Sequence, residues 1–166
     1  MHSSLLGSTV SAYLDTLYKK YGAWVSNNSY LICKDPILTS KIFNRIRYGG
    51  LDQAPNPDDL RAHLKYPSHI GGEKVVWVRD LTVGYDSNNT PDFKPSLPVS
   101  ASSQMLTFRL ANEFMITLRT SGTEPKIKYY TEYKGVDGNV ESAQRYLDGI
   151  LDGIIQELLD PSRNGL

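Results

Sequence analysis

The chain has 166 residues, of which 40% are hydrophobic, so it can bury one core and hardly two. Its 18 acidic and 18 basic residues cancel, which argues against a nucleic-acid binder with a broad basic surface. Cys33 is the single cysteine, which excludes an internal disulfide and a cysteine-based zinc site. No apolar run approaches the ~20 residues that cross a bilayer, and the signal-peptide pattern is absent, so we expect a cytoplasmic protein without a membrane partner.

Hydrophobic periodicity and end signals predict the main elements. Gly22 ends the first helical pattern, Asp35 and Pro36 are suited to begin the second helix, and Pro161 ends the last. Alternating apolar and polar residues predict the strands, two of which form a hairpin. In chain order we predict a helix over residues 10–21, a strand over 24–33, a helix over 36–47, strands over 75–79, 105–110, 114–119 and 126–133, and a helix over 140–158.

Two long stretches lack a strong periodic pattern. Residues 48–74 are polar and rich in proline and glycine, and a short helix is predicted to begin at Asn56. Residues 81–103 form a long irregular segment with several prolines. Because loops of that length are typically functional or inserted, we expect this segment to pack against the domain or against another one.

This order of elements predicts the α+β class, with a mostly antiparallel sheet and helices packed on one face. We assign residues 1–22 to an N-terminal helical segment that ends a preceding domain or a linker. Residues 23–160 form the main domain, and residues 161–166 form a tail. The first helix has no evident partner in the main domain, so we expect it to leave an exposed apolar patch.

The most informative stretch has the chemistry of an anion-binding turn and lies between the last two predicted strands. It reads RTSGTEPK over residues 119–126. Arg119 can bind two phosphate oxygens at once, and Ser121 and Thr123 supply hydroxyl groups. Gly122 lets the backbone come close to a ligand and can adopt a left-handed conformation. Successive backbone N–H groups in such a turn can form a concave anion nest.

Charged residues follow this turn. Lys126 and Lys128 add positive charge on one face of the outgoing strand. Glu124 opposes an anion, so we expect its side chain to turn away from the ligand, to pair with Lys126 or to hold Arg119 in place. The alternative is an ordinary exposed turn, because Ser-Gly-Thr before proline is common turn chemistry.

Other acidic and histidine residues do not predict a metal site. Asp58 and Asp59 fit the first turn of a helix, where the helix dipole favours acidic groups. His63 and His69 have no spaced carboxylates or third ligand near them, so we expect solvated loop histidines.

The stretch RTSGTEPK between two strands resembles the C-terminal signature of the α-D-phosphohexomutase family, the phosphoglucomutases and phosphomannomutases. Three further segments resemble the eukaryotic branch of phosphoglucomutase/phosphopentomutase and glucose 1,6-bisphosphate synthase: SYLIC (residues 29–33), RDLTVGYD (79–86) and SSQM (102–105). The resemblance runs from about Tyr13 to Leu159 and covers only the last part of a family enzyme. It implies a fold usually compared with the TATA-box-binding protein, without a DNA-binding role.

The resemblance also implies a function. Family enzymes interconvert sugar 1-phosphates and sugar 6- or 5-phosphates in carbohydrate metabolism, using a phosphoserine and a magnesium-binding Asp-rich loop that this chain lacks. Their last domain clamps the phosphate that does not react. By resemblance, the clamp residues are Arg119, Ser121, Gly122 and Thr123, with Lys126 and Lys128 as secondary candidates.

We therefore expect no catalytic residue, metal or cofactor in this chain and no mutase activity from it alone. The resemblance assigns Mg²⁺ and a sugar bisphosphate activator to the full-length enzyme. The expected partners are a sugar phosphate and the missing catalytic domains of the same enzyme. The alternative is a free-standing module that binds sugar phosphates without catalysis. The sequence does not distinguish a hexose phosphate from a pentose phosphate as substrate, or a mutase from a bisphosphate synthase.

Overall fold

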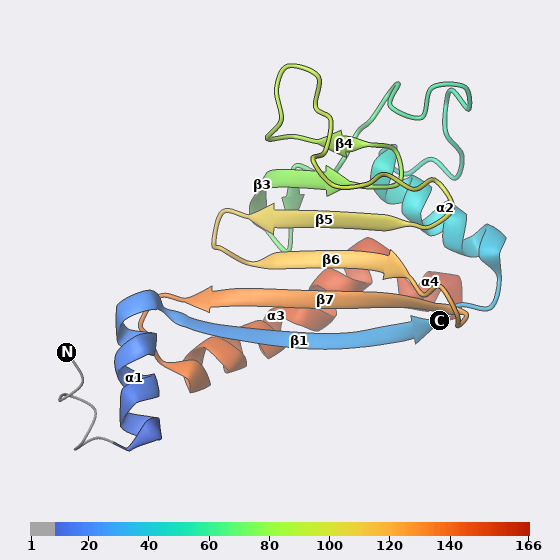
Figure 1. Cartoon of the computed structure of the whole chain (residues 1–166). Coiled ribbons are helices and arrows are strands. Elements are labelled where there is room, and N and C mark those ends of the chain that lie inside the picture. The colour runs from blue at the N-terminus through green and yellow to red at the C-terminus, as the bar shows by residue number, and fades with distance from the viewer. Residues whose placement is uncertain (1–8) are drawn as a thin grey trace.

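The computed structural model describes residues 9–166, in which helices cover one face of an antiparallel sheet (Figure 1). Residues 1–8 of the predicted N-terminal segment lie outside the described residues. The helices are α1 (Val10–Tyr21), α2 (Pro36–Arg47), α3 (Val140–Leu159) and α4 (Pro161–Asn164). The strands are β1 (Ala23–Ile32), β2 (His69–Ile70), β3 (Glu73–Asp80), β4 (Tyr85–Asp86), β5 (Met105–Leu110), β6 (Met115–Thr120) and β7 (Lys126–Gly135).

The sheet brings the first and last long strands together. Its strand order is β1-β7-β6-β5-β3-β2, with β4 paired to β3, and these pairs are antiparallel. β1 and β7 pair along their whole lengths, from Ala23 opposite Gly135 to Ile32 opposite Lys126. The predicted α+β class is confirmed, and the fold matches the TATA-box-binding-protein-like C-terminal domain of phosphohexomutases.

Side-chain caps begin the three long helices. The Asp35 side chain accepts the backbone N–H of Ile37 at 2.8 Å at the start of α2. Thr9 and Asn139 cap α1 and α3 in the same way. Gly22 ends α1 with a φ of 90°, a conformation that favours glycine. Local sequence signals therefore place these helix ends.

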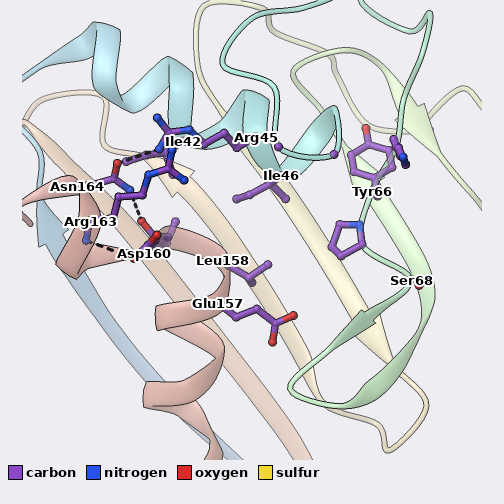
Figure 2. Close-up of a pocket in the computed structure, with 15 residues that line it drawn as sticks. Ile42, Arg45, Ile46, Tyr66, Ser68, Glu157, Leu158, Asp160, Arg163 and Asn164 are labelled. Atoms are coloured by element: carbon purple, nitrogen blue, oxygen red, sulfur yellow. Dashed lines mark hydrogen bonds between the residues drawn. The ribbon is translucent and has the colours of Figure 1, made fainter.

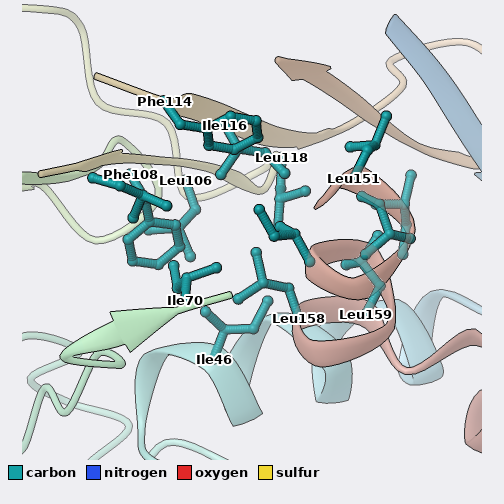
Figure 3. Close-up of a cluster of buried hydrophobic side chains, with 14 of the residues drawn as sticks. Ile46, Ile70, Leu106, Phe108, Phe114, Ile116, Leu118, Leu151, Leu158 and Leu159 are labelled. Carbon is teal, nitrogen blue, oxygen red and sulfur yellow. The ribbon is translucent and has the colours of Figure 1, made fainter. Parts of the chain in front are cut away.

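The core lies between the sheet and the helices (Figure 3). β5 and β6 contribute alternate buried residues: Leu106, Phe108, Leu110, Ile116 and Leu118. From α3 come Ala143, Leu147, Leu151, Ile154, Ile155, Leu158 and Leu159. Each large apolar side chain buried in this way contributes about 1.5–3 kcal/mol relative to exposure. Gly135 permits the close approach of α3 to β7, since a Cβ there would lie 2.7 Å from the Cβ of Ala143.

α1 differs from the other long helices because none of its residues is buried. Val10 is 78% exposed, Tyr13 48% and Leu14 42%, which confirms the predicted apolar patch. Tyr18 alone from this helix packs, partly buried, against the core cluster of the described residues. Within residues 9–166, no helix has the length and apolar character needed to span a membrane.

The irregular stretches depart from the prediction. The short helix predicted from Asn56 is wrong, because the following residues form turns in which the Asn56 and Asp59 side chains accept nearby backbone N–H groups. The strands β2 and β4 were missed, since two residues carry no periodic pattern. Residues 161–164 of the predicted tail form α4, which Asp160 caps.

Candidate functional site

The candidate site lies where residues 121–125 connect the ends of β6 and β7. The β6–β7 register places Arg119 opposite Lys128, so these two cations are neighbours on one face of the sheet. That face is turned away from the core, because the adjacent residues Leu118 and Ile127 are fully buried. Strand alternation therefore positions the cations on the side opposite the helices.

The connecting loop has backbone donors that are free to bind a ligand. The N–H of Ser121 donates to the carbonyl of Lys126 at 3.0 Å, and the N–H of Lys126 donates to the carbonyl of Glu124 at 2.8 Å. The N–H groups of residues 122–124 have no hydrogen-bond acceptor in the described part of the chain. Consecutive free N–H groups at a turn are the donors from which protein anion sites are built.

Gly122 can adopt a left-handed conformation but does not do so here, since it is not among the glycines with positive φ. The two hydrogen bonds of the loop and the fixed φ of Pro125 close the turn without it. A Cβ at position 122 would have no neighbouring atom within 4 Å. The glycine therefore leaves open space beside the free N–H groups.

Arg119 is half-buried and is held by an aromatic side chain. Its Nη2 donates to the Tyr130 hydroxyl at 3.0 Å, and its Cζ lies 5.3 Å from the centre of the same ring. The hydrogen bond from Arg119 lowers the pKa of Tyr130 below its ordinary value. No salt bridge within residues 9–166 includes Arg119, so its charge is available to an anion.

Glu124 pairs with the lysines. Its carboxylate accepts a hydrogen bond from Lys126 Nζ at 2.9 Å and lies 3.8 Å from Lys128 Nζ. The hydrogen bond from Lys126, together with the lysine charges, lowers the pKa of Glu124. The same hydrogen bond raises the pKa of Lys126, whose Nζ also lies 4.0 Å from the centre of the Tyr30 ring. The expected pairing with Lys126 is confirmed, whereas Arg119 is held by a different residue.

The predicted site residues thus gather around one loop and the two strand ends beside it, namely Arg119, Ser121, Gly122, Thr123, Lys126 and Lys128. Of these residues, Ser121 and Lys126 line a cavity of about 310 Å³ next to the loop, whereas Arg119 and Lys128 do not. Its walls come from the loop, from the start of α2 and from the end of the long irregular segment. Polar side chains predominate among the lining residues Lys34, Thr39, Ser40, Ser102, Gln104, Thr120, Ser121, Glu124 and Lys126.

A larger cavity, about 460 Å³, lies between α2, α3 and α4 (Figure 2). None of the predicted site residues lines it. Arg45 lines it and donates to Asp52 at 2.5 Å and to Asn164 at 3.0 Å, and Glu157 accepts the backbone N–H of Gly71 at 2.7 Å. These groups already join neighbouring elements. We therefore place the candidate site at the β6–β7 loop, which has free N–H groups and follows the strand that carries Arg119.

Acidic and histidine residues elsewhere do not assemble into a metal centre. Within residues 9–166, no group of three or more His, Cys, Asp or Glu side chains could hold a metal ion. Asp59 accepts the backbone N–H of Arg61 at 3.0 Å, which is a turn-capping contact. His69 lies 3.1 Å from the hydroxyl of the adjacent Ser68.

Three neighbours of the site were missed in the sequence. Tyr130 could have been found, because it lies two residues after Lys128 on the same strand face. Tyr30 comes from β1 and lies opposite Lys128 through a long-range pairing that no local pattern predicts. Gln104 lies in the SSQM segment, which resembled relatives but had no assigned role.

Several known proteins are similar to this chain in sequence. No protein-family model matches the chain. It is 41% identical over 160 residues to the glucose 1,6-bisphosphate synthase of Homo sapiens and 37% identical over 161 residues to the phosphopentomutase of Homo sapiens. It is 35% identical over 159 residues to a probable phosphoribomutase of Schizosaccharomyces pombe. Each match covers 95% of this chain and 24% or 25% of the relative, so the chain spans about a quarter of the length of these relatives. The chain is therefore homologous to a C-terminal part of phosphohexomutase-type proteins.

Proposed function

We propose that this chain is the phosphate-clamping C-terminal domain of an enzyme that interconverts sugar 1-phosphates with sugar 6- or 5-phosphates. One observation carries this proposal: the free N–H groups of residues 122–124 lie in the connection that directly follows β6, and Arg119 near the end of β6 has no carboxylate partner within residues 9–166. Charge-assisted hydrogen bonds are about twice as strong as neutral ones, and a guanidinium fork matches two phosphate oxygens. The names of the relatives, a bisphosphate synthase and two pentose or ribose mutases, support sugar phosphates as the ligand class.

In this proposal, Glu124 occupies the lysines until a ligand arrives. Its contacts with Lys126 and Lys128 are ion pairs at the surface, where water screens the charges and makes such pairs weak. A phosphate dianion that also receives hydrogen bonds from Arg119 and the loop N–H groups competes successfully for the same lysines. Glu124 then turns away from the ligand.

A clamp of this composition recognises phosphate and leaves the sugar free to differ. Backbone N–H groups, hydroxyls and one guanidinium contact phosphate oxygens only, so they accept a sugar in more than one orientation. This suits an enzyme that must hold either end of a bisphosphorylated intermediate. Binding the non-reacting phosphate also orients the reacting end, so the clamp contributes to turnover as well as to affinity.

A binding titration with paired variants tests the clamp. We expect the chain to bind glucose 1-phosphate weakly, with a Kd of about 1 mM, because it supplies one wall of a cleft. Arg119→Ala should raise that Kd about tenfold or more, since hydrogen bonds to charged groups contribute about 1.5–3 kcal/mol. Arg109→Ala is the matched control, because Arg109 is exposed at the other end of β5, opposite Met115. Equal affinity in the two variants, measured by NMR titration, would rule out the clamp.

We assign phosphoryl transfer, the magnesium ion and the bisphosphate activator to other parts of such an enzyme. The purified chain should therefore show no conversion of glucose 1-phosphate to glucose 6-phosphate in a coupled assay. Turnover that follows the chain through further purification steps contradicts this assignment. Micromolar binding by the chain alone would instead favour a free-standing binding module. The exposed apolar residues of α1 favour a domain of a larger enzyme over a free-standing module, because they are suited to packing against further protein.

A further inference from the structure

Gln104 lies where a buried ion pair reaches the cavity beside the loop. Arg47 Nε is 2.6 Å from Asp80 Oδ2, and the two side chains are only 2% and 0% exposed. Arg47 Nη2 also donates to Gln104 Oε1 at 3.0 Å. Gln104 lines the cavity of about 310 Å³ together with Ser121 and Lys126. One glutamine thus connects the core to the candidate site.

The contact with Arg47 determines how the Gln104 amide is oriented. A guanidinium has donors only, so the amide must present its oxygen to Arg47. The amide nitrogen must then point away from Arg47, and it donates to no residue in the described part of the chain. Rotating the amide would face donor against donor and leave Arg47 short of an acceptor.

The backbone of Gln104 is also tied to the loop. Its N–H donates to Thr120 Oγ1 at 3.1 Å, and the N–H of Thr120 donates back to the Gln104 carbonyl at 3.1 Å. On the other side, Thr82 Oγ1 accepts the N–H of Met105 at 3.0 Å, and Asp80 accepts the N–H of Thr82 at 2.9 Å. Hydrogen bonds therefore connect Thr120, which precedes the loop, through Gln104 and Met105 to Thr82 and Asp80.

We propose that Gln104 is a ligand-binding residue, whose amide nitrogen donates to an oxygen of the phosphorylated ligand in this cavity. The buried pair of Arg47 and Asp80 holds the amide in that orientation. The inference rests on the proposed function, in which the loop holds the phosphate. It also gives a common role to residues 79–86 and 102–105, since the first segment supplies the buried carboxylate and the second supplies the amide.

Two substitutions at Gln104 and one control test the inference. Gln104→Glu keeps an acceptor for Arg47 and removes the donor, and Gln104→Met removes both with little change in volume. Ser102→Asp is the control, because it places a negative charge on the same cavity wall and leaves the Gln104 amide intact. We expect both Gln104 variants to raise the Kd for glucose 1-phosphate about tenfold, equivalent to about 1.4 kcal/mol. Ser102→Asp should have a smaller effect that disappears at high salt.

The NMR titration that gives these constants has a direct readout. The side-chain amide signals of Gln104, identified by their loss in Gln104→Met, should shift on saturation with glucose 1-phosphate. Titration with inorganic phosphate identifies the acceptor: equal losses for both ligands indicate a phosphate oxygen, and a loss for glucose 1-phosphate alone indicates a sugar oxygen. Thermal unfolding of both Gln104 variants should give a cooperative transition, which checks that they remain folded.

Specific results overturn the inference. Parental affinity in Gln104→Met, or side-chain amide signals that stay in place at saturation, would exclude the contact. If Ser102→Asp and Gln104→Glu weaken binding equally and Gln104→Met keeps the parental Kd, the added negative charge alone explains the loss of affinity. If Arg119→Ala weakens binding and the Gln104 variants do not, this inference fails by itself. If the parent chain does not bind, or Arg119→Ala binds like the parent, the proposed function fails and this inference fails with it.

Discussion

At Arg119, one guanidinium is oriented without being neutralised. Tyr130 accepts one of its N–H groups and stacks against it, whereas a carboxylate in that position would also cancel its charge. The remaining donors stay available on the open face of the sheet. The lysines are treated differently, because Glu124 pairs with both of them. The site therefore holds one cation without a carboxylate partner and two cations that share the carboxylate of Glu124.

The ionisation of Tyr130 tests this geometry. Because Arg119 donates to the hydroxyl oxygen, the pKa of Tyr130 is lowered in the folded protein. A lowered folded pKa stabilises the native state above the unfolded pKa of about 10, and this contribution is lost as the pH falls through the folded pKa. An NMR pH titration of the Tyr130 ring should return to the ordinary tyrosine range in Arg119→Ala. A titration curve that is the same in both proteins would contradict the contact.

Among the elements, α2 and β3 are joined by the buried ion pair of Arg47 and Asp80, and Arg47 also contacts Gln104 at the cavity. Burial by itself lowers the pKa of Arg47, but the charge and the hydrogen bond of Asp80 outweigh it and raise the pKa. Tyr66 adds a hydrogen bond to Asp80 at 3.0 Å. Burial, and then the negative charge of Asp80, raise the pKa of Tyr66. Arg47 therefore stays charged inside the protein, and it connects Asp80 in the core to Gln104.

Breaking this pair should be costly. Arg47→Leu leaves the fully buried Asp80 carboxylate without its cation, and we expect it to lower the free energy of unfolding by about 3–5 kcal/mol. Arg45→Leu is the matched control from the same helix, because its partner Asp52 is 43% exposed. It should cost clearly less than Arg47→Leu, because water screens an exposed pair and solvates the remaining carboxylate. Urea unfolding of the two variants measures the difference, and similar losses in both would show that the burial of the pair has no special weight.

At the scale of the whole molecule, stability is distributed unevenly between the helices. α3 buries seven residues against the sheet, whereas α1 buries none. An isolated helix shorter than about 12–15 residues is only marginally stable in water, and within the described chain α1 packs on the core through Tyr18 alone. Its exposed tyrosine and leucine side chains mark it as the surface on which further protein is expected to pack.

Hydrogen exchange separates these helices experimentally. We expect the amides of α1 to exchange through local opening at low free energy, and those of α3 to approach the protection of global unfolding. α2 is the matched control, since it is also 12 residues long but buries four of them: Ile42, Phe43, Ile46 and Arg47. It should exchange more slowly than α1. Equal protection of α1 and α2, measured by mass spectrometry, would mean that α1 is packed more firmly than its exposure indicates.

Much of this protein was predictable from sequence because the relevant signals are local. Helical spacing with Asp35 and Gly22 predicted α2 and the end of α1, and strand alternation predicted the hairpin of β5 and β6. The order of elements predicted the fold class. The same local reasoning gathered Arg119 and Lys128 around one loop, since both belong to the strands that flank it.

The tertiary structure decided what depends on residues far apart in the chain. It brought Tyr30 opposite Lys128 through the β1–β7 pairing, and it joined Arg47 to Asp80 across 33 positions. It also showed that the loop closes without a left-handed Gly122. By itself, the sequence determined the elements and the chemistry of the turn, because periodicity and turn preferences act over a few residues. Only the folded chain determined which side chains support that turn, because strand register and buried pairing depend on the whole core and leave no local pattern.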